Sequence, residues 1–398
     1  MDEETTTTSI SIGVPKETFP GERRVAMIPD VAASLIKEGA KVYVESGAGA
    51  LSGFTDAAYT EKGAEIVSDR KELFQKADMI LQVRAAGANP DKGKADLDLY
   101  RSGQVIIGHF EPLSESGIAR QVARKGVTAY AMELIPRITR AQSMDALSSM
   151  ATISGYQAVV MAAEQSPKMF PLMMTASGTI SPAHVFVIGA GVAGLQAIAT
   201  ARRLGAVVKA FDVRPAVKEQ VQSLGARFVE LEMESQDAEG KGGYAKEMGE
   251  EFYRRQQQMM ADVVEDSDVV ITTAAVPGKK APVLINKDVV DRMRPGSIIV
   301  DLAAERGGNC ELTRPDETVE ENQVKIFGPT NLPSTTPYHA SQMYSRNVLS
   351  LVRHILKNGG MQPNRDDEII KGTMLTFDGQ VVNEQVRELT GNKPETQQ

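Results

Sequence analysis

Short apolar runs alternate with longer stretches of helical periodicity along most of the chain, a pattern typical of parallel strands joined by crossover helices. In the N-terminal portion, the runs that predict strands are 11–14, 41–45, 79–83 and 105–108. The stretches between them that predict helices are 28–38, with Pro29 near its start and Gly39 after its end, and 57–62. Residues 10–140 are therefore predicted to form one α/β unit.

The same alternation resumes after a long helical stretch at 144–164, which is a candidate interdomain helix. The predicted strands of this second portion are 185–188, 207–211, 269–273, 297–302 and 324–327, with a helix at 195–204. Helical periodicity returns at 341–356, and we expect this helix to pack on the first unit. The predicted fold class is α/β, with two Rossmann-like doubly wound domains separated by a cleft. The predicted domains are 10–140 with 340–390, and 141–339, between disordered tails at 1–9 and 391–398.

Composition narrows the class of protein. The 398 residues include 44 Lys and Arg against 52 Asp and Glu, a net charge of −8, which argues against non-specific nucleic-acid binding. The single cysteine, Cys310, excludes an intrachain disulfide and a multi-cysteine zinc site, and it fits a reducing compartment. The four histidines show no metal-ligand spacing, so no metal is expected. These features predict a soluble cytoplasmic protein.

One segment requires a test for membrane insertion, because residues 169–201 contain no Asp, Glu, Lys or Arg. Pro171, Pro182, four glycines and several hydroxyl residues interrupt it, which favours a strand, a loop and a helix over a membrane span. The N-terminus begins Met-Asp-Glu-Glu and four threonines, with neither a cationic start nor an apolar run. It is therefore not predicted to be a secretory signal.

A glycine motif, Gly189-Ala190-Gly191-Val192-Ala193-Gly194, directly follows a predicted strand and opens a predicted helix. In a dinucleotide site, such glycines permit a tight turn, close approach of a pyrophosphate, and close helix–strand packing. The next strand ends at Asp212, where a carboxylate can accept ribose hydroxyls and repel a 2′-phosphate, which favours NAD(H). Arg214 could hold a 2′-phosphate only if Asp212 turned away. The alternative is a structural glycine turn beside a surface aspartate.

Other candidate features favour structural roles. A second glycine run, 47–53, has its third glycine one residue late and is interpreted as a turn. Cys310 has no histidine near it in sequence, so an ordinary loop cysteine is expected. His184 and His354 are expected to be structural, whereas His109 ends a strand and is the histidine that could act as an acid or base.

The polar segment 230–260, with Gly243 and Tyr244, is either a functional loop or a solvated insertion followed by a helix at 244–262.

Several longer motifs together resemble the alanine dehydrogenase and transhydrogenase superfamily. They are Ile12-Gly13-Val14-Pro15-Lys16-Glu17, Glu22-Arg23-Arg24-Val25-Ala26, Tyr130-Ala131-Met132-Glu133, the run Pro136 to Asp145, and the glycine motif. The run Arg137-Ile138-Thr139-Arg140-Ala141-Gln142-Ser143-Met144-Asp145 is specific to the NAD(H)-binding components of proton-translocating NAD(P) transhydrogenases. The resemblance extends from about residue 10 to the hairpin-like segment 372–382.

The resemblance implies a set of site residues and partners. Arg137, Gln142, Asp145 and Ser148 would be catalytic: Arg137 and Ser148 would orient the carboxamide, and Gln142 would touch the nucleotide of a partner. Gly243 and Tyr244 match a loop that closes on NAD(H). The implied cofactor-binding residues are Arg137, Ile138, Thr139, Arg140, Gly189, Gly191, Val192, Gly194, Asp212, Val213, Arg214, Gly243, Tyr244 and Ala275. NADP(H) would be held by a partner subunit, membrane subunits would move protons, and the chain would be a homodimer on the cytoplasmic face.

Two alternative functions stay open at this point. The first is an alanine dehydrogenase-like enzyme, whose residues are matched at Arg24 and His109. Arg84 replaces the lysine and Glu305 the aspartate of that pattern, and a guanidinium is a poor proton shuttle. The second alternative is a non-catalytic NAD(H) sensor. The replacements at Arg84 and Glu305 are compatible with hydride exchange between two nicotinamides. That reaction needs ring orientation and water exclusion but no side-chain acid or base.

Overall fold

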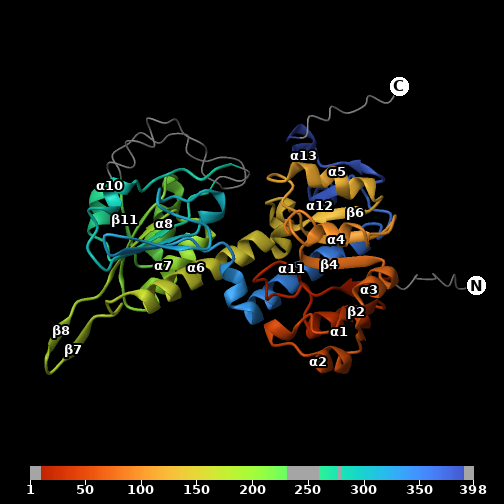
Figure 1. Cartoon of the computed structure of the whole chain (residues 1–398), viewed down its shortest axis with the longest axis horizontal. Coiled ribbons are helices and arrows are strands. Elements are labelled where there is room, and N and C mark those ends of the chain that lie inside the picture. Colours follow the sequence, from red (N-terminus) through yellow and green to blue (C-terminus); the bar gives the residue numbers. More distant parts are fainter. Residues whose placement is uncertain (1–9, 231–259, 276–278, 390–398) are drawn as a thin grey trace, which may run out of the picture. The chain divides into compact units, whose positions relative to one another are not determined.

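The computed structural model describes residues 10–230, 260–275 and 279–389. It divides the chain into two compact units: unit 1 comprises 1–150 and 334–398, and unit 2 comprises 151–333. Helix α6 (Ala146–Gln165) begins in unit 1 and ends in unit 2. Each unit contains one large sheet (Figure 1).

The sheet of unit 1 has eight strands in the order β17-β16-β6-β5-β4-β1-β2-β3. The strands from β6 to β3 are parallel, and β16 and β17 add an antiparallel edge. Their bounds are β1 Ser11–Val14, β2 Lys41–Glu45, β3 Glu65–Val67, β4 Met79–Arg84, β5 Val105–His109, β6 Thr128–Ala131, β16 Met374–Phe377 and β17 Gln380–Val381.

Helices follow the strands of unit 1 in the doubly wound manner. Their bounds are α1 Pro29–Lys37, α2 Asp56–Glu61, α3 Arg70–Lys76, α4 Gly93–Leu97, α5 Ser116–Arg124, α11 Pro337–Lys357, α12 Glu368–Thr373 and α13 Glu384–Leu389, with the 3₁₀ turns η1 Ala50–Ser52, η2 Met132–Leu134 and η3 Thr139–Met144. Helix α11 returns to unit 1, where Tyr344 donates its hydroxyl to the Gln82 carbonyl oxygen at 2.7 Å. Leu73 and Phe74 of α3 pack in one core cluster with Ile80 and Ile106 of the sheet.

The sheet of unit 2 has seven strands in the order β11-β10-β9-β12-β13-β15-β14, parallel except for β14. The strands are β9 His184–Ile188, β10 Val207–Phe211, β11 Arg227–Phe228, β12 Val269–Thr272, β13 Ile298–Asp301, β14 Thr318–Glu321 and β15 Val324–Phe327; the helices are α7 Val192–Arg203, α8 Lys218–Ser223 and α10 Lys287–Val290, with η4 Pro215–Val217, η5 Ala304–Arg306 and η6 Leu332–Thr335. Numbered by chain order, both sheets run 3-2-1-4-5-6 through their parallel strands, which is the Rossmann order.

Both faces of the unit 2 sheet are buried, which explains the continuous apolar runs in the sequence. On β9, Val185 and Val187 join a cluster with α7, while Phe186 and Ile188 join a cluster on the opposite face. When both faces of a strand are buried, apolar residues do not alternate with polar ones. The strand is then a continuous apolar run in the sequence, and the two ends of the run predict its bounds.

The predicted fold class and most element positions are confirmed. The strands at 11–14, 41–45, 207–211 and 324–327 match residue for residue, and the segment 372–382 contains the antiparallel pair β16 and β17. Two helix starts were predicted too late. Helix α7 begins at Val192, inside the glycine motif, and α11 begins at Pro337, because proline at the first helical position starts that helix four residues earlier.

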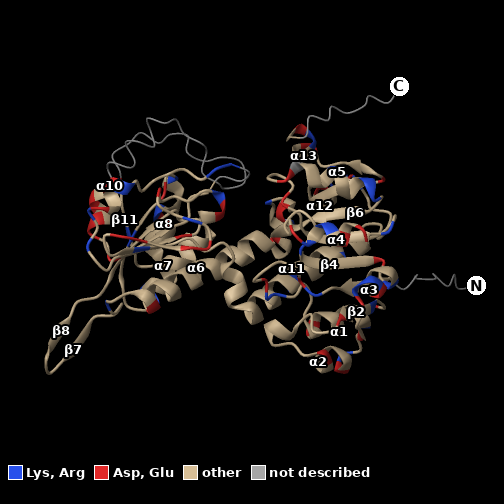
Figure 2. Ribbon diagram, in the orientation of Figure 1, with Lys and Arg blue, Asp and Glu red and all other residues tan. Residues whose placement is uncertain are grey.

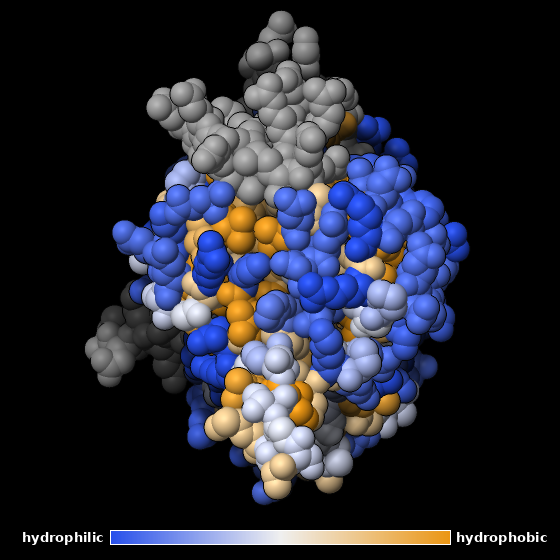
Figure 3. Space-filling model, turned by 90° about the vertical axis from the view of Figure 1, so that its left-hand side faces the viewer, coloured by the Kyte–Doolittle hydropathy of each residue, from blue (hydrophilic) through white to orange (hydrophobic). Residues whose placement is uncertain are grey.

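The charge-free segment contains an element that the sequence did not predict. A hairpin of β7 (Met173–Thr175) and β8 (Gly178–Ile180) precedes β9. It carries no charged residue and projects from its unit (Figure 2). The exposed fractions of Leu172 and Met174 are 54% and 78%. In space-filling view the projecting part has few of the hydrophilic residues that dominate the surrounding surface (Figure 3).

Among the described residues, no helix combines the length and apolar character that a membrane crossing requires. The predicted tails lie outside the described ranges, as does nearly all of the predicted helix at 244–262, of which residues 260–262 are described and helical.

Candidate functional site

The glycine motif forms the connection from β9 to α7. Gly189 has a φ of 96°, in the left-handed region that favours glycine, and its N–H donates to the Phe211 carbonyl oxygen at 2.8 Å. A Cβ on Gly194 would lie only 1.8 Å from the Gly189 carbonyl oxygen. The first and third glycines are therefore required by the turn and by helix–strand contact.

The second glycine has a different environment. Gly191 is the N-cap of α7, with φ −76° and ψ −167°, values that other residues adopt readily. A Cβ built on it would have no atom of the described residues within 4 Å. The fold alone does not explain a glycine there, whereas a phosphate approaching the first-turn N–H groups of α7 does.

Asp212 lies at the end of β10, next to this loop. Its Oδ2 accepts a hydrogen bond from the Ala190 N–H at 2.7 Å, so the carboxylate is tied to the glycine motif. Arg214 donates its own N–H and its Nε to Oδ1 at 2.8 and 2.9 Å, and its Nη2 to Oδ2 at 2.9 Å. All four acceptor positions of the carboxylate are thus engaged. A ribose hydroxyl would reach Asp212 by replacing a donor of Arg214.

The loop after β12 closes the other side of the glycine turn. Thr273 donates its hydroxyl to the Gly189 carbonyl oxygen at 3.1 Å. Asn309 accepts from the Ala274 N–H at 3.0 Å and donates Nδ2 to the carbonyl oxygens of Ala274 and Pro282 at 2.8 and 2.9 Å. The predicted site residue Ala275 follows directly and is exposed.

Asp301 organises the neighbouring loop. Its side chain is fully buried and accepts from the N–H groups of Asn309 and Cys310 at 2.7 and 3.0 Å, and from the hydroxyls of Thr272 and Thr313 at 2.9 and 2.7 Å. The sequence pattern did not mark Asp301 and Asn309 as functional residues. The available signal was the position of Asp301 at the carboxyl end of a predicted strand, where doubly wound sheets place functional loops.

The transhydrogenase-like run lies in unit 1, on the connection from β6 through η3 to α6. Arg137, Thr139, Arg140 and Gln142 are exposed and Ile138 is half-buried. The Nη1 of Arg140 is 3.6 Å from Oδ2 of Asp367. The backbone of the run is attached to α11, because Asn347 of this helix donates Nδ2 to the Ser143 carbonyl oxygen at 2.8 Å. It therefore presents polar side chains on a fixed backbone.

Asp145 and Ser148, both predicted as catalytic, contact each other in the structure. Oδ1 of Asp145 accepts from the Ser148 N–H at 2.9 Å, and Oδ2 accepts from the Ser148 hydroxyl at 2.6 Å. Asp145 directly precedes α6, so this contact caps the first turn of the helix.

The other predicted residues are distributed as follows. In unit 2, Gly189, Gly191, Gly194, Asp212 and Arg214 are brought together by the contacts above, Val192 is exposed at the start of α7, and Val213 is half-buried. Gly243 and Tyr244 lie outside the described residues. Glu305 is exposed in η5.

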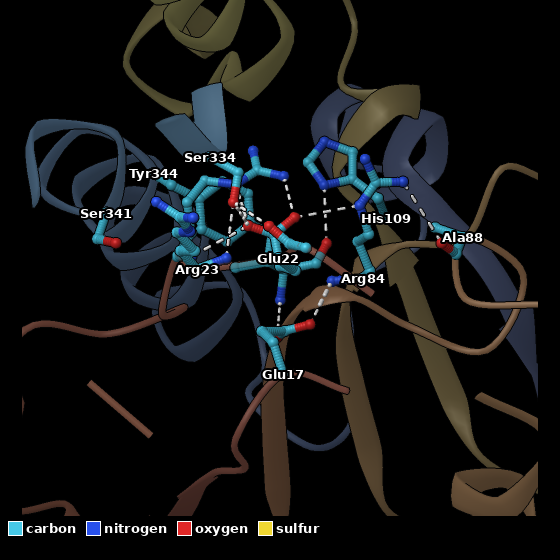
Figure 4. A network of polar contacts seen from close by, with 12 residues as sticks. Glu17, Glu22, Arg23, Arg84, Ala88, His109, Ser334, Ser341 and Tyr344 are labelled. Carbon is cyan, nitrogen blue, oxygen red and sulfur yellow. Dashed lines mark hydrogen bonds and ion pairs between the residues drawn. The ribbon is translucent and has the colours of Figure 1, made fainter. Parts of the chain in front are cut away.

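His109 ends β5 beside Arg84 and Glu22 (Figure 4). Its Nδ1 lies 2.9 Å from the Val83 carbonyl oxygen, and since a carbonyl only accepts, Nδ1 carries the proton. Burial and the charge of Arg24 lower the pKa of His109 to about 4. The ring is therefore neutral near pH 7, and its Nε2 has no proton to donate.

Cys310 was expected to be an ordinary loop cysteine; it is buried, and burial raises the pKa of its thiol to about 11, which disfavours a nucleophilic thiolate. The second glycine run is a structural turn: the Gly47 N–H donates to Asp56 at 2.8 Å, and a Cβ on Gly49 would clash with the Phe54 carbonyl oxygen. Within the described ranges, no three His, Cys, Asp or Glu side chains gather as a metal site requires.

Comparisons with known proteins cover both units. Residues 13–154 match the family model described as "Alanine dehydrogenase/PNT, N-terminal domain", and residues 158–384 match "Alanine dehydrogenase/PNT, C-terminal domain". The chain is 46% identical over 377 residues to the first part of the NAD(P) transhydrogenase alpha subunit of Rhodospirillum rubrum, covering 94% of this chain and 98% of that protein. It is 28% identical to alanine dehydrogenase of Bacillus subtilis, covering 94% and 93% of the two chains. Among solved structures, a transhydrogenase from Sinorhizobium meliloti superposes with a TM-score of 0.83 at 42% identity, covering 94% and 100%.

Proposed function

The chain belongs to the alanine dehydrogenase/PNT family, and from this premise we propose that it is the NAD(H)-binding subunit of a proton-translocating transhydrogenase. In this role it transfers hydride from NADH to NADP⁺ held by a partner subunit. Membrane subunits couple the exchange to proton movement, and the chain docks through its partners on the cytoplasmic face of a membrane. The observation that carries the proposal is the β9–α7 loop, where Gly191 leaves open space before a helix N-terminus and Asp212 lies beside it.

The residues of this loop fit a dinucleotide. The first-turn N–H groups of α7 would hold the pyrophosphate. Asp212 would accept hydrogen bonds from the ribose hydroxyls after they replace one of the hydrogen bonds that Arg214 donates to its carboxylate. Bound NADH supplies the hydride. The protein supplies orientation: we propose that Arg137 and Ser148 hold the carboxamide and that Gln142 contacts the partner's nucleotide. None of these residues has to move a proton, because hydride exchange between two nicotinamides releases none.

Oxidative deamination is the competing function, because alanine dehydrogenases are relatives at 28% identity. One residue of unit 1 argues against it. Arg84 stands where the resemblance places the lysine of alanine dehydrogenases, and a guanidinium stays charged at all practical pH values and is a poor proton shuttle. NADH oxidation that depends on pyruvate and ammonium would support that alternative. A nucleotide sensor would bind NADH without exchanging hydride with any NADP-binding component.

Asp212→Asn is expected to weaken the binding of NADH and to strengthen the binding of NADPH. The amide keeps an acceptor for the Ala190 N–H but loses the charge that holds Arg214 and repels a 2′-phosphate. We expect about tenfold weaker NADH binding and a similar gain for NADPH, measured by fluorescence titration. The matched control is Asp212→Asn with Arg214→Gln, which should lose the NADPH gain. An unchanged NADH-to-NADPH ratio in the single variant would refute the role of Asp212.

We further propose that the chain forms the homodimer that the resemblance implies, with the β7–β8 hairpin in the interface, so that changing this hairpin dissociates the dimer. A two-stranded hairpin with exposed apolar side chains is marginal in water by itself and needs a surface to cover it. Leu172→Asp combined with Met174→Asp should weaken the dimer at least about a hundredfold, because each buried apolar side chain contributes roughly 1.5–3 kcal/mol. Light scattering across a dilution series measures this. Leu51→Asp, at an equally exposed position in unit 1, is the control and should leave the dimer intact.

A further inference from the structure

The 3₁₀ turn η3 sorts the side chains of the transhydrogenase-like run onto three faces. A 3₁₀ helix has three residues per turn, so the side chains at positions i and i+3 lie one above the other. Ala141 and Met144 share one face, and only 1% and 6% of them is exposed. Thr139 and Gln142 share the second face, and both are exposed. The rotation of the turn about its axis therefore determines where Gln142 points.

The third face carries Arg140, whose guanidinium lies next to α12. Its Nη1 is 3.6 Å from Oδ2 of Asp367, and its Nη2 is 3.6 Å from Oε2 of Glu368. Asp367 is the N-cap of α12 and Glu368 is the first residue of this helix. One guanidinium thus bridges two adjacent carboxylates.

Asp367 is itself fixed to two helices. Its Oδ1 accepts from the N–H groups of Ile369 and Ile370 at 2.9 and 3.0 Å, and it lies 2.8 Å from Nε2 of His354 on α11. Burial would raise the pKa of Asp367, but the hydrogen bonds from His354 and from the N–H groups of α12 outweigh it and lower the pKa. The carboxylate that faces Arg140 is therefore ionised near pH 7 and held in place.

The two ends of the run are attached to the same two helices. A Cβ built on Gly372 would lie only 3.3 Å from Cδ of Pro136, so the proline ring packs directly on α12. At the other end, Ser143 accepts the hydrogen bond from Asn347 of α11. The ion pairs of Arg140 are the electrostatic attachment between these two contacts.

We propose that Arg140 and Asp367 are positioning residues for hydride transfer, supported by Glu368. Arg140 acts through the backbone of η3, because its ion pairs fix the rotation of the turn and thereby the direction of Gln142. The resemblance implies a cofactor-binding role for Arg140, whereas its guanidinium contacts α12. This role rests on the proposed function, in which the rate depends on orientation. An ion pair this exposed contributes little to folding stability, but a small displacement of a reacting group changes the rate strongly.

A double-variant cycle tests this role, with the full chain and an NADP(H)-binding component. Arg140→Met removes the charge and keeps an unbranched side chain. Asp367→Asn keeps an oxygen to cap α12 and removes the charge that faces Arg140. We expect each variant to slow single-turnover transfer about fivefold and to change NADH affinity less than about twofold. Because both remove the same contact, the double variant should also be about fivefold slower, and not about twenty-fivefold.

Three further variants sharpen the comparison. Arg140→Lys keeps the charge, and its transfer rate should stay within about twofold of wild type. Glu368→Gln should slow transfer about twofold, and because 62% of the Glu368 side chain is exposed, it keeps the test valid if Asp367→Asn fails to fold. Glu384→Gln is the matched control. Glu384 is also the first residue of a short helix, α13, and pairs with Lys371 at 3.0 Å, so its change should leave transfer unchanged.

Amide hydrogen exchange of residues 139–144, measured without nucleotide, is the readout that needs no hydride transfer. Exchange should be faster in Arg140→Met and in Asp367→Asn than in wild type. Unchanged exchange, rate losses that multiply in the double variant, or a loss of NADH affinity in Arg140→Met that matches its loss of rate would overturn the proposal. Absence of transfer by the wild-type chain would instead contradict the proposed function, and the exchange result would still decide the role of Arg140.

Discussion

Gly191→Asp is expected to abolish NADH binding while leaving the fold intact. The new Cβ enters space that no described residue occupies, and the backbone angles of Gly191 suit other residues, so the melting temperature should stay within about 1 °C. The added carboxylate would stand where the pyrophosphate approaches α7. We expect affinity to fall at least about a hundredfold, equal to about 2.7 kcal/mol, as measured by calorimetric titration.

Gly117→Asp is the matched control for this prediction. Gly117 lies in α5 of unit 1, and a Cβ there also has no described atom within 4 Å. The same charge change at this position should leave NADH affinity unchanged. Normal NADH binding by Gly191→Asp would mean that the β9–α7 loop is not the phosphate site.

Arg137→Ala is expected to slow hydride transfer about a hundredfold and to change NADH affinity less than about threefold. The side chain is exposed on a connection anchored by Asn347, so its removal should not disturb the core. A ring displaced by about 1 Å loses roughly this factor in rate. Gln142→Asn, which shortens the side chain by one methylene, should show the same division between rate and affinity.

The measurement is single-turnover hydride transfer beside NADH titration of the same preparation. Arg124→Ala in α5 removes another exposed arginine of unit 1 and serves as the control. Equal losses of rate and affinity in Arg137→Ala would assign this residue to binding instead of orientation.

The elements that could be predicted are those whose burial on the sheet produces a recognisable run of apolar residues in the local sequence. Strands such as β1 and β10 are apolar runs between turns, so their bounds could be read residue for residue. Strand β6, Thr-Ala-Tyr-Ala, has small and polar side chains and was missed, although it lies between β5 and β16. The β7–β8 hairpin was missed because its apolar residues are exposed and follow no periodicity.

The candidate site divides in the same way. The glycine motif and Asp212 are recognisable because their roles depend on short spacing. The hydrogen bonds of Asp301 and Asn309 join loops up to 35 residues apart in the sequence, so no local sequence pattern predicts them. Arg214 was recognised only as a possible 2′-phosphate ligand, since the sequence cannot show that its guanidinium already pairs with Asp212. The pairing of Glu22 with Arg84, 62 residues apart, was beyond reach for the same reason.

Stopped-flow hydride transfer tests the central claim most directly. The chain, loaded with NADH, is mixed with NADP⁺ either free or bound to a purified NADP(H)-binding transhydrogenase component. The account predicts rapid single-turnover transfer with the component and almost none with free NADP⁺. Comparable transfer without the component, or none with it despite tight NADH binding, would contradict the assignment as a transhydrogenase subunit.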